Sequence, residues 1–316
     1  MKLISLLISL FFITLANAQT RTIVVAKDGS GNFTTVQAAF NSIPFHNKKP
    51  VIIYIKNGIY KEKLHLDSTK EFVTLRGQDR FSTILTFNDH TGVITSKGDT
   101  INTYSSYSFL ESANYFKAEN ITFNNDAGFT AGQAVALDIT GDEVIIDNCR
   151  ITGNQDVLFM SYPSTRQVFT HCYIEGTTDF IFGPSTAWFE QCHIHSKKNS
   201  HVTAASTPEQ QRYGFVFHDC VLTGDTVLNK VSLGRPWRPY AKVVYIECYI
   251  DRHIYPAGWS NWNNTENYKT TYYAEYHNYG PGSDIKKRLL WSHQLSDEEV
   301  KQYKISNVIG KWYRPS

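Results

Sequence analysis

Four polar residues lie beside apolar segments at nearly equal spacing: Gln133, Gln155, Asp156 and Asp179. The steps from Gln133 to Gln155 and from Asp156 to Asp179 are 22 and 23 residues. Two carboxyl groups held close together cannot both ionise easily, so one stays protonated and the other anionic. The anion can attack a carbonyl carbon, the acid can protonate a leaving alcohol, and amide N–H groups can hold an oxyanion. On one shared face of a fold, these residues predict ester hydrolysis.

A fixed cation and a flat aromatic ring follow in the stretch Leu-Gly-Arg235-Pro-Trp237. An arginine beside Asp179 would keep that carboxylate ionised and aimed through charge-assisted hydrogen bonds. Trp237 and Phe182 could stack on the C–H faces of a sugar. Each residue alone also has a structural interpretation, as a turn cap, a backbone partner or a rigid edge turn. The shared spacing favours the catalytic interpretation.

The elements that must position these residues are visible in a repeat that contains all five cysteines. Its pattern is a large apolar residue, two further residues, Cys, one residue, and Ile or Leu. An earlier copy at Phe116–Phe123 has Ile121 in the cysteine position, and the successive intervals from Ile121 are 28, 23, 20, 28 and 28 residues. The later copies are Ile146–Ile151, Phe169–Ile174, Phe189–Ile194, Phe217–Leu222 and Tyr245–Ile250.

This repeat predicts an all-β, single-domain parallel β-helix. Alternation within each copy predicts a strand with Cys and Ile on one face. The interval is too short for a βαβ unit, but it suits one coil of several short strands. Coils stacked about 4.8 Å apart would gather the four polar residues on one face. Earlier coils are expected at Val51–Ile55, Glu71–Leu75 and Gly92–Ile94, and short capping helices at Phe33–Phe40 and Ser296–Tyr303.

The column of cysteines allows a disulfide. Cys172 and Cys192 share the repeat position on adjacent coils, which would bring their Cα atoms within bonding range. We predict a bridge between them, with an unbridged column of thiols as the alternative. A metal site is not expected, because the sequence has no Cys-x-x-Cys pair and the spacing is not that of zinc ligands.

Residues 1–18 have the features of a secretory signal peptide. Lys2 precedes the apolar run Leu3–Leu15, and Ala16-Asn-Ala18 is a small-x-small cleavage site. The run is shorter than the roughly 20 apolar residues of a membrane-spanning helix. We therefore expect a secreted or periplasmic protein, cleaved after Ala18, with a catalytic domain over residues 19–316 and no membrane association.

Composition narrows the function classes. A hydrophobic content of 41% with 19% charged residues excludes intrinsic disorder. Lys and Arg number 31 against 29 Asp and Glu, so no basic stripe suggests a nucleic-acid partner. Aromatic residues make up 14%, which suits a β-rich protein with a stacking surface. We expect a monomer.

The segments resemble pectin methylesterases, the carbohydrate esterases that demethylate homogalacturonan. The match runs along the length of the mature chain, and Val157 and Thr178 are its small departures, where Thr and Val are common. The segments that carry it, in order, are Val25–Gly31 with Thr35-Val-Gln37, Gly58-Ile-Tyr60-Lys-Glu62, the four segments around Gln133, Gln155-Asp156, Asp179 and Arg235/Trp237, then Pro256–Trp259 and Tyr273–Gly282.

The resemblance implies a right-handed parallel β-helix and hydrolysis of methylesterified polygalacturonate by water, without metal or cofactor. It also implies a role for each site residue. Asp179 is then the nucleophile, Asp156 the general acid and later base, Gln133 and Gln155 the oxyanion site, Arg235 the residue that orients Asp179, and Phe182 and Trp237 the lining of the sugar cleft.

Three other functions are alternatives to a pectin methylesterase. An esterase or thioesterase for another acyl group could keep the same residues, although Arg235 and Trp237 favour a sugar. A non-catalytic polysaccharide-binding β-helix would have lost Asp or Gln from the site. A calcium-dependent lyase would need clustered acids, whereas these are spaced for ester hydrolysis.

Overall fold

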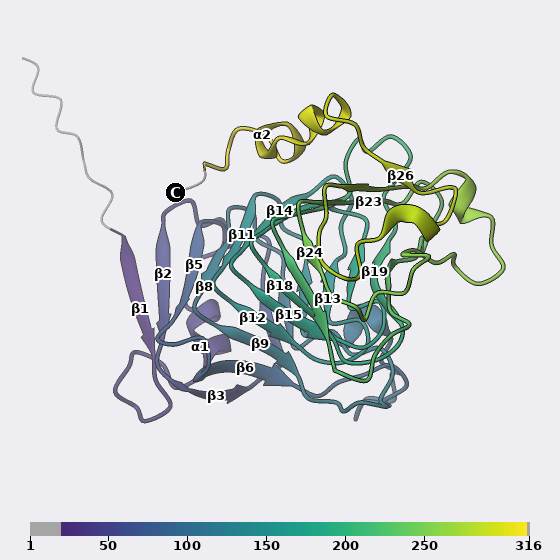
Figure 1. The fold of residues 1–316 in the computed structure, drawn as a ribbon. Coiled ribbons are helices and arrows are strands. Elements are labelled where there is room, and N and C mark those ends of the chain that lie inside the picture. The colour runs from purple at the N-terminus through teal and green to yellow at the C-terminus, as the bar shows by residue number, and fades with distance from the viewer. Residues whose placement is uncertain (1–19, 315–316) are drawn as a thin grey trace, which may run out of the picture.

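The computed structural model describes residues 20–314, which wind into stacked coils with three faces (Figure 1). Each face is a sheet in which every pair of neighbouring strands is parallel. The eleven-stranded sheet contains β1 (Arg21–Val25), β2 (Val51–Ile55), β5 (Val73–Gly77), β8 (Lys117–Glu119), β11 (Val144–Asp147), β14 (Arg166–Thr170), β17 (Thr186–Glu190), β20 (Phe215–His218), β23 (Lys242–Ile246), β25 (Tyr272–Tyr276) and β26 (His293–Gln294).

The other two faces complete each coil. The eight-stranded sheet contains β3 (Gly58–Lys61), β6 (Thr83–Phe87), β9 (Thr122–Asn125), β12 (Arg150–Thr152), β15 (Tyr173–Gly176), β18 (His193–Ser196), β21 (Val221–Gly224) and β24 (Tyr249–Ile250). The seven-stranded sheet contains β4 (Leu64–Leu66), β7 (Phe109–Glu111), β10 (Leu137–Ile139), β13 (Leu158–Met160), β16 (Ile181–Gly183), β19 (His201–Ala205) and β22 (Ser232–Gly234). This architecture is a parallel β-helix, and the fold prediction is confirmed.

The core runs along the inside of the coils and is built from stacked like residues. Phe169, Phe189, Phe217 and Tyr245 hold the first position of successive repeat copies. Their rings stack with centroids 4.7, 4.4 and 4.4 Å apart. Because the register keeps these residues opposite one another, one aromatic ladder stabilises four coils.

The alternation predicted that each repeat copy is a single strand, and this prediction is wrong. Each copy bends at the residue before the cysteine position, which has a left-handed backbone conformation with φ between 49 and 59° in the six copies. These residues are Asn120, Asn148, His171, Gln191, Asp219 and Glu247. The bend ends a strand of the eleven-stranded sheet and begins one of the eight-stranded sheet. The repeat therefore marks a corner of the coil.

The disulfide prediction is wrong, because all five cysteines are free thiols buried at this corner. The Cys172 thiol donates to the carbonyls of Thr170 and Ile146 at 3.3 Å each. The Cys192 thiol donates to Glu190 and Phe169 in the same way. Stacked side chains run parallel and keep the coil spacing of about 4.8 Å, whereas an S–S bond needs about 2.05 Å. The alternative, an unbridged column, describes the structure.

A short helix covers the N-terminal end of the core and overlaps the predicted stretch Phe33–Phe40. α1 (Val36–Asn41) begins after Thr35, whose hydroxyl accepts from Ala38 N at 3.4 Å. The Glu62 carboxylate also accepts from the backbone N–H groups of Val36 and Gln37, at 2.9 and 3.1 Å. A negative charge at a helix N-terminus is stabilising, so Glu62 of the Gly-x-Tyr-x-Glu motif anchors this cap.

Two elements of the structure differ from those that the sequence predicts. Gly92–Ile94 is not a coil strand; Ile94 is 71% exposed and bridges Thr100 in a protruding loop. The Ser296–Tyr303 stretch forms the 3₁₀-helix η4 (Glu299–Tyr303), followed by α2 (Ile305–Val308). This segment packs along the outer side of the eleven-stranded sheet and does not close the end of the core (Figure 1). The other short 3₁₀-helices are η1 (Thr103–Ser105), η2 (Asn267–Lys269) and η3 (Ile285–Lys287).

No helix within residues 20–314 is long and apolar enough to cross a membrane. The signal-peptide stretch lies outside the described residues.

A buried ion pair holds the C-terminal end of the coils. Arg288 donates to both oxygens of Glu275, at 2.8 and 3.0 Å, and the side chains are 4% and 1% exposed. Trp259 Nε1 donates to Glu275 at 3.1 Å, and Arg288 also donates to the carbonyls of Pro256 and Gly282. These contacts join the two C-terminal segments that carry the family resemblance, Pro256–Trp259 and Tyr273–Gly282.

Glu275→Gln is expected to lower the free energy of unfolding by roughly 3 kcal/mol, because it leaves the Arg288 charge buried and unpaired. Thermal or denaturant unfolding followed by circular dichroism measures the change. Glu266→Gln is the control, since Glu266 pairs with Lys269 on the exposed surface and its loss should barely move the midpoint. Equal effects of the two substitutions would contradict the importance of burial.

Candidate active site

The seven-stranded sheet stacks the two predicted carboxylates on adjacent coils. Leu158 of β13 pairs with Ile181 of β16, so Asp156 and Asp179, each two residues earlier, share one position. Asp156 N donates to Thr178 O at 3.0 Å, which continues the ladder between the coils at this point. The carboxylates are 8% and 4% exposed. The coil spacing therefore brings them together in a nearly buried place.

Both aspartates have a left-handed backbone conformation, with φ of 61° and 51°. This conformation is uncommon for residues other than glycine, and Asp adopts it more readily than most. Each aspartate marks the turn by which the chain enters the seven-stranded sheet. The same conformation occurs at the corner before each cysteine position, so it belongs to the turns of the coil, and here equivalent turns present the two aspartates.

Arg235 holds Asp179 in a two-point contact. Its Nε donates to Oδ1 at 3.0 Å and its Nη2 donates to Oδ2 at 2.6 Å. The guanidinium lies 4.0 Å from the centroid of the Trp262 ring, which fixes the plane of the fork. Asp179 is thus a carboxylate with a set orientation.

The two carboxyl groups have different electrostatic surroundings. Burial raises the pKa of Asp156 well above its ordinary value, and the charge of Asp179 raises it further, against the opposing effects of Arg235 and a Gln155 hydrogen bond. Burial also raises the pKa of Asp179, but the hydrogen bonds and charge of Arg235 oppose it. Asp156 therefore holds a proton more tightly than Asp179, whose anionic form Arg235 favours.

The two glutamines lie on adjacent coils beside the carboxylates. Gln133 and Gln155 form a parallel bridge, and Ala134 N donates to Gln155 O at 3.1 Å. Gln155 directly precedes Asp156 in the chain. Their amide groups stand at the same coil position as donors that a developing oxyanion could use.

Aromatic rings continue the site along the helix axis. Phe159 and Phe182 stack with centroids 4.2 Å apart, and Trp237 lies 6.0 Å from Phe182. Trp262 and Tyr107 pack against the same cluster. The structure therefore brings the predicted Phe182 and Trp237 to the carboxylates and adds three rings beside them.

Four of the residues around the site were missed by sequence reasoning. Phe159 follows Asp156 at the same spacing as Phe182 follows Asp179, so the coil repeat carried a signal for it. His201 stacks next to Asp179 in the ladder, and its Nδ1 lies 2.7 Å from Ser232 Oγ. Burial lowers the pKa of His201 to about 4, and Arg235 contributes, so this ring is neutral. Trp262 and Tyr107 lie in loops without a motif.

Among residues 20–314, no group of three or more His, Cys, Asp or Glu side chains gathers in an arrangement that could hold a metal ion. That the site needs none remains a prediction.

Comparison with known proteins places this geometry in a family. A family model described as Pectinesterase matches residues 22–311. The chain is a member of the pectinesterase family. Two relatives from Arabidopsis thaliana are Pectinesterase 31, 40% identical over 90% of this chain and 90% of its own length, and Putative pectinesterase 11, 36% identical over 92% and 80%.

Solved structures agree with this membership. A pectin methylesterase from carrot is 32% identical, with a TM-score of 0.85 over 91% of this chain and 93% of that one. The pectin methylesterase PemA from Erwinia chrysanthemi is 28% identical, with a TM-score of 0.82 over 94% and 99%. A pectin methylesterase in complex with a hexasaccharide has the same TM-score. These three pectin methylesterases thus share the fold of this chain over nearly its whole length.

Proposed function

We propose that the chain is a pectin methylesterase that removes methyl esters from homogalacturonan with Asp179 as nucleophile and Asp156 as acid and base. The observation that carries the proposal is the stacking of two carboxyl groups on adjacent coils, one of which, Asp179, is held by Arg235 in a two-point contact. Burial and the nearby Asp179 raise the pKa of the other, Asp156, which favours its protonated form. That pair can attack and protonate in the same event.

In the first step, an Asp179 oxygen attacks the ester carbonyl carbon of one galacturonate unit. The carbonyl π electrons move to oxygen, and the side-chain amides of Gln133 and Gln155 donate hydrogen bonds to this oxyanion. The bond to the methoxy group then breaks. Asp156 gives its proton to the leaving oxygen, methanol departs, and the galacturonoyl group remains bound to Asp179 as an acyl-enzyme.

In the second step, Asp156 is a carboxylate and can accept a proton from water. The resulting hydroxide attacks the acyl carbon, the bond to Asp179 breaks, and the galacturonic acid that forms loses its proton to solvent and leaves as the carboxylate. Asp156 ends protonated and Asp179 ends anionic beside Arg235, so the site is restored. Water and one methyl ester are consumed, and methanol and one acid are formed.

The row of aromatic rings supports a sugar as the substrate. Trp237 is partly exposed and packs on the buried rings of Phe182 and Phe159, which lie on the coils of Asp179 and Asp156. Flat rings suit the C–H faces of pyranose units. An acyl substrate without a sugar would leave this surface unused, which favours pectin over the esterase or thioesterase alternative.

Incubation with highly methylated pectin tests the function. We expect methanol release and falling pH, with polymer length unchanged in size-exclusion chromatography, because no step above touches the glycosidic bond. Fully de-esterified pectate is the control and should yield no methanol. Chain shortening without a matching amount of methanol would mean that the carboxylates act on the anomeric carbon, as in glycosidases.

The setting of the activity is also proposed. The stretch before residue 19 supports export and cleavage after Ala18, which would place the enzyme outside the cytoplasm with its polymeric substrate. The near-balanced charge supports action without a nucleic-acid partner, and we propose a monomer. N-terminal sequencing of the exported protein and its molar mass in solution check these points.

A further inference from the structure

One acidic side chain faces outward from the seven-stranded sheet without a role in the mechanism above. Leu137 and Ile139 of β10 are in the core, so Asp138 between them faces the other way. In register with it, on successive coils, are Leu110, Phe159, Phe182 and Ala204. Asp138 is the only acid in this row, one coil from Phe159 and two from Phe182.

The fold does not use Asp138 as a structural ion. Among the described residues no cation contacts it, and its one hydrogen bond comes from the Ser161 hydroxyl to Oδ1. Asp138 is nevertheless buried, with an exposed fraction of 3%. A buried carboxyl with a single partner costs stability, in contrast to Glu275, which Arg288 and Trp259 satisfy. Such a group next to a binding surface is a candidate for function.

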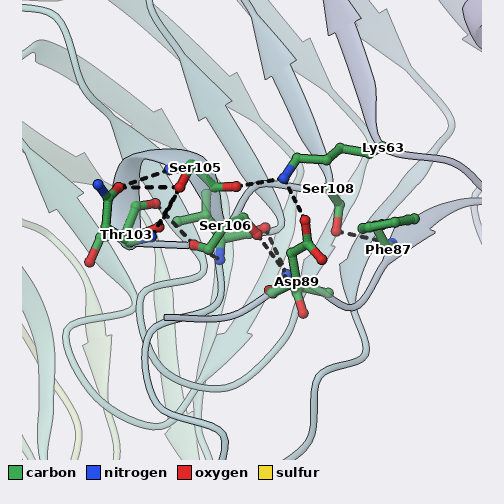
Figure 2. Close-up of polar contacts among 10 residues, drawn as sticks. Lys63, Phe87, Asp89, Thr103, Ser105, Ser106 and Ser108 are labelled. Carbon is green, nitrogen blue, oxygen red and sulfur yellow. Dashed lines mark hydrogen bonds and ion pairs between the residues drawn. The ribbon is translucent and has the colours of Figure 1, made fainter. Parts of the chain in front are cut away.

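The loop between β6 and β7 supplies Tyr104 and Tyr107, which pack against the rings of this row. Lys63 donates to Asp89 and to the Ser105 carbonyl, and so fixes both ends of the loop (Figure 2). Tyr107 then lies under the Lys63 ammonium, 4.9 Å from its ring centroid. Tyr104 is 59% exposed and meets Phe159 edge-on at 5.3 Å. Asp138, Phe159 and Phe182 are at most 3% exposed, so the row is buried, and Tyr104 and Tyr107 form part of the aromatic layer that packs on it beyond the catalytic coils.

The charge of Asp138 changes near neutral pH. Burial raises its pKa to about 7, against the Ser161 hydrogen bond. The titratable groups that face it are Tyr107, whose pKa is raised by burial and by Asp138, and Glu111 of β7, whose pKa burial raises well above its ordinary value. Both shifts favour the neutral forms of Tyr107 and Glu111, and no ion pair within residues 20–314 involves Asp138.

We propose that Asp138 is a specificity-determining residue that reads whether the galacturonate unit next to the reacting one is esterified. The inference rests on the proposed function, which lays a galacturonate chain along this row. A free carboxylate on that neighbouring unit is repelled by the Asp138 anion, whereas a methyl ester is not. A protonated Asp138 tolerates both and can donate its proton to either oxygen.

Binding of fully de-esterified hexagalacturonate, measured by calorimetry at pH 6 and pH 8, tests the proposal. The Kd of the wild type should rise between pH 6 and pH 8. The ratio of the two Kd values should be roughly 3- to 30-fold larger than in Asp138→Asn, which keeps the shape of the side chain without its charge. Ser161→Ala keeps the charge of Asp138 but removes the hydrogen bond that lowers its pKa. The rise in Kd of this variant should therefore occur at a higher pH than in the wild type. Asp225→Asn, on the exposed eight-stranded side, is the control and should follow the wild type.

The outcomes separate the two proposals. The ligand has no ester, so the binding result does not depend on turnover, and methanol release reports on the function alone. An equal rise of the Kd with pH in Asp138→Asn and in the wild type would overturn the role of Asp138. Failure of hexagalacturonate to bind the wild type at pH 6 would overturn it as well, because a neutral Asp138 offers no repulsion.

Discussion

Asp179→Asn should reduce the rate of methanol release by at least ~10³-fold, because an amide cannot form the acyl-enzyme. Asn has nearly the same shape as Asp, so the coil and its turn should survive. The loss should appear in kcat, with a smaller change in KM, since the sugar contacts of Phe182 and Trp237 remain. Initial rates on highly methylated pectin measure both constants.

Two controls show whether this loss is chemical. The β circular dichroism and the unfolding midpoint of Asp179→Asn should stay close to the wild type, with allowance for the lost charge beside Arg235. Asp225→Asn removes an acid from an exposed position and should retain full activity. Activity of Asp179→Asn near that of the wild type would show that Asp179 is a structural partner of Arg235 and not the nucleophile.

The sequence predicts that the two aspartates lie close together, because the length of one coil can be counted in residues between repeat copies. A step of 23 residues between Asp156 and Asp179, among cysteine intervals of similar size, fixes their register. The structure adds what an interval does not contain. The left-handed turn at each aspartate, and the burial that divides their charges, depend on tertiary contacts made by other coils.

Other features depend on geometry that no spacing reveals. The thiols of Cys172 and Cys192 share one position in the chain pattern, but parallel stacking keeps their sulfur atoms apart. The Gly92–Ile94 stretch is apolar like a strand and lies in a loop. Trp262 reaches Arg235 from a loop 27 residues later, where neither periodicity nor a motif marks it. Loops that cover a solenoid carry little periodic signal, and they supply part of this site.

Asp156→Asn should lower kcat by ~10²- to 10⁴-fold, the usual range for loss of a general acid and base. The sign of the pH dependence follows from the raised pKa of Asp156. The reactive form has Asp156 protonated, so wild-type kcat/KM should fall as pH rises through that pKa. It should also fall as pH drops through the pKa of Asp179, when the nucleophile becomes protonated. Asp156→Asn should lose the alkaline limb and keep the acid one.

An activated ester separates the two roles of Asp156. A 4-nitrophenyl ester of a galacturonate oligomer has a leaving group that needs no proton, so Asp156→Asn should still release nitrophenol in the first step. The second step lacks its base, and the acyl group should stay on Asp179. Stopped-flow absorbance should therefore show a burst of about one equivalent per enzyme, followed by a slow phase, as expected for acyl-enzyme accumulation. If methyl and nitrophenyl esters lost rate equally and without a burst, Asp156 would not be the group that protonates the leaving alcohol.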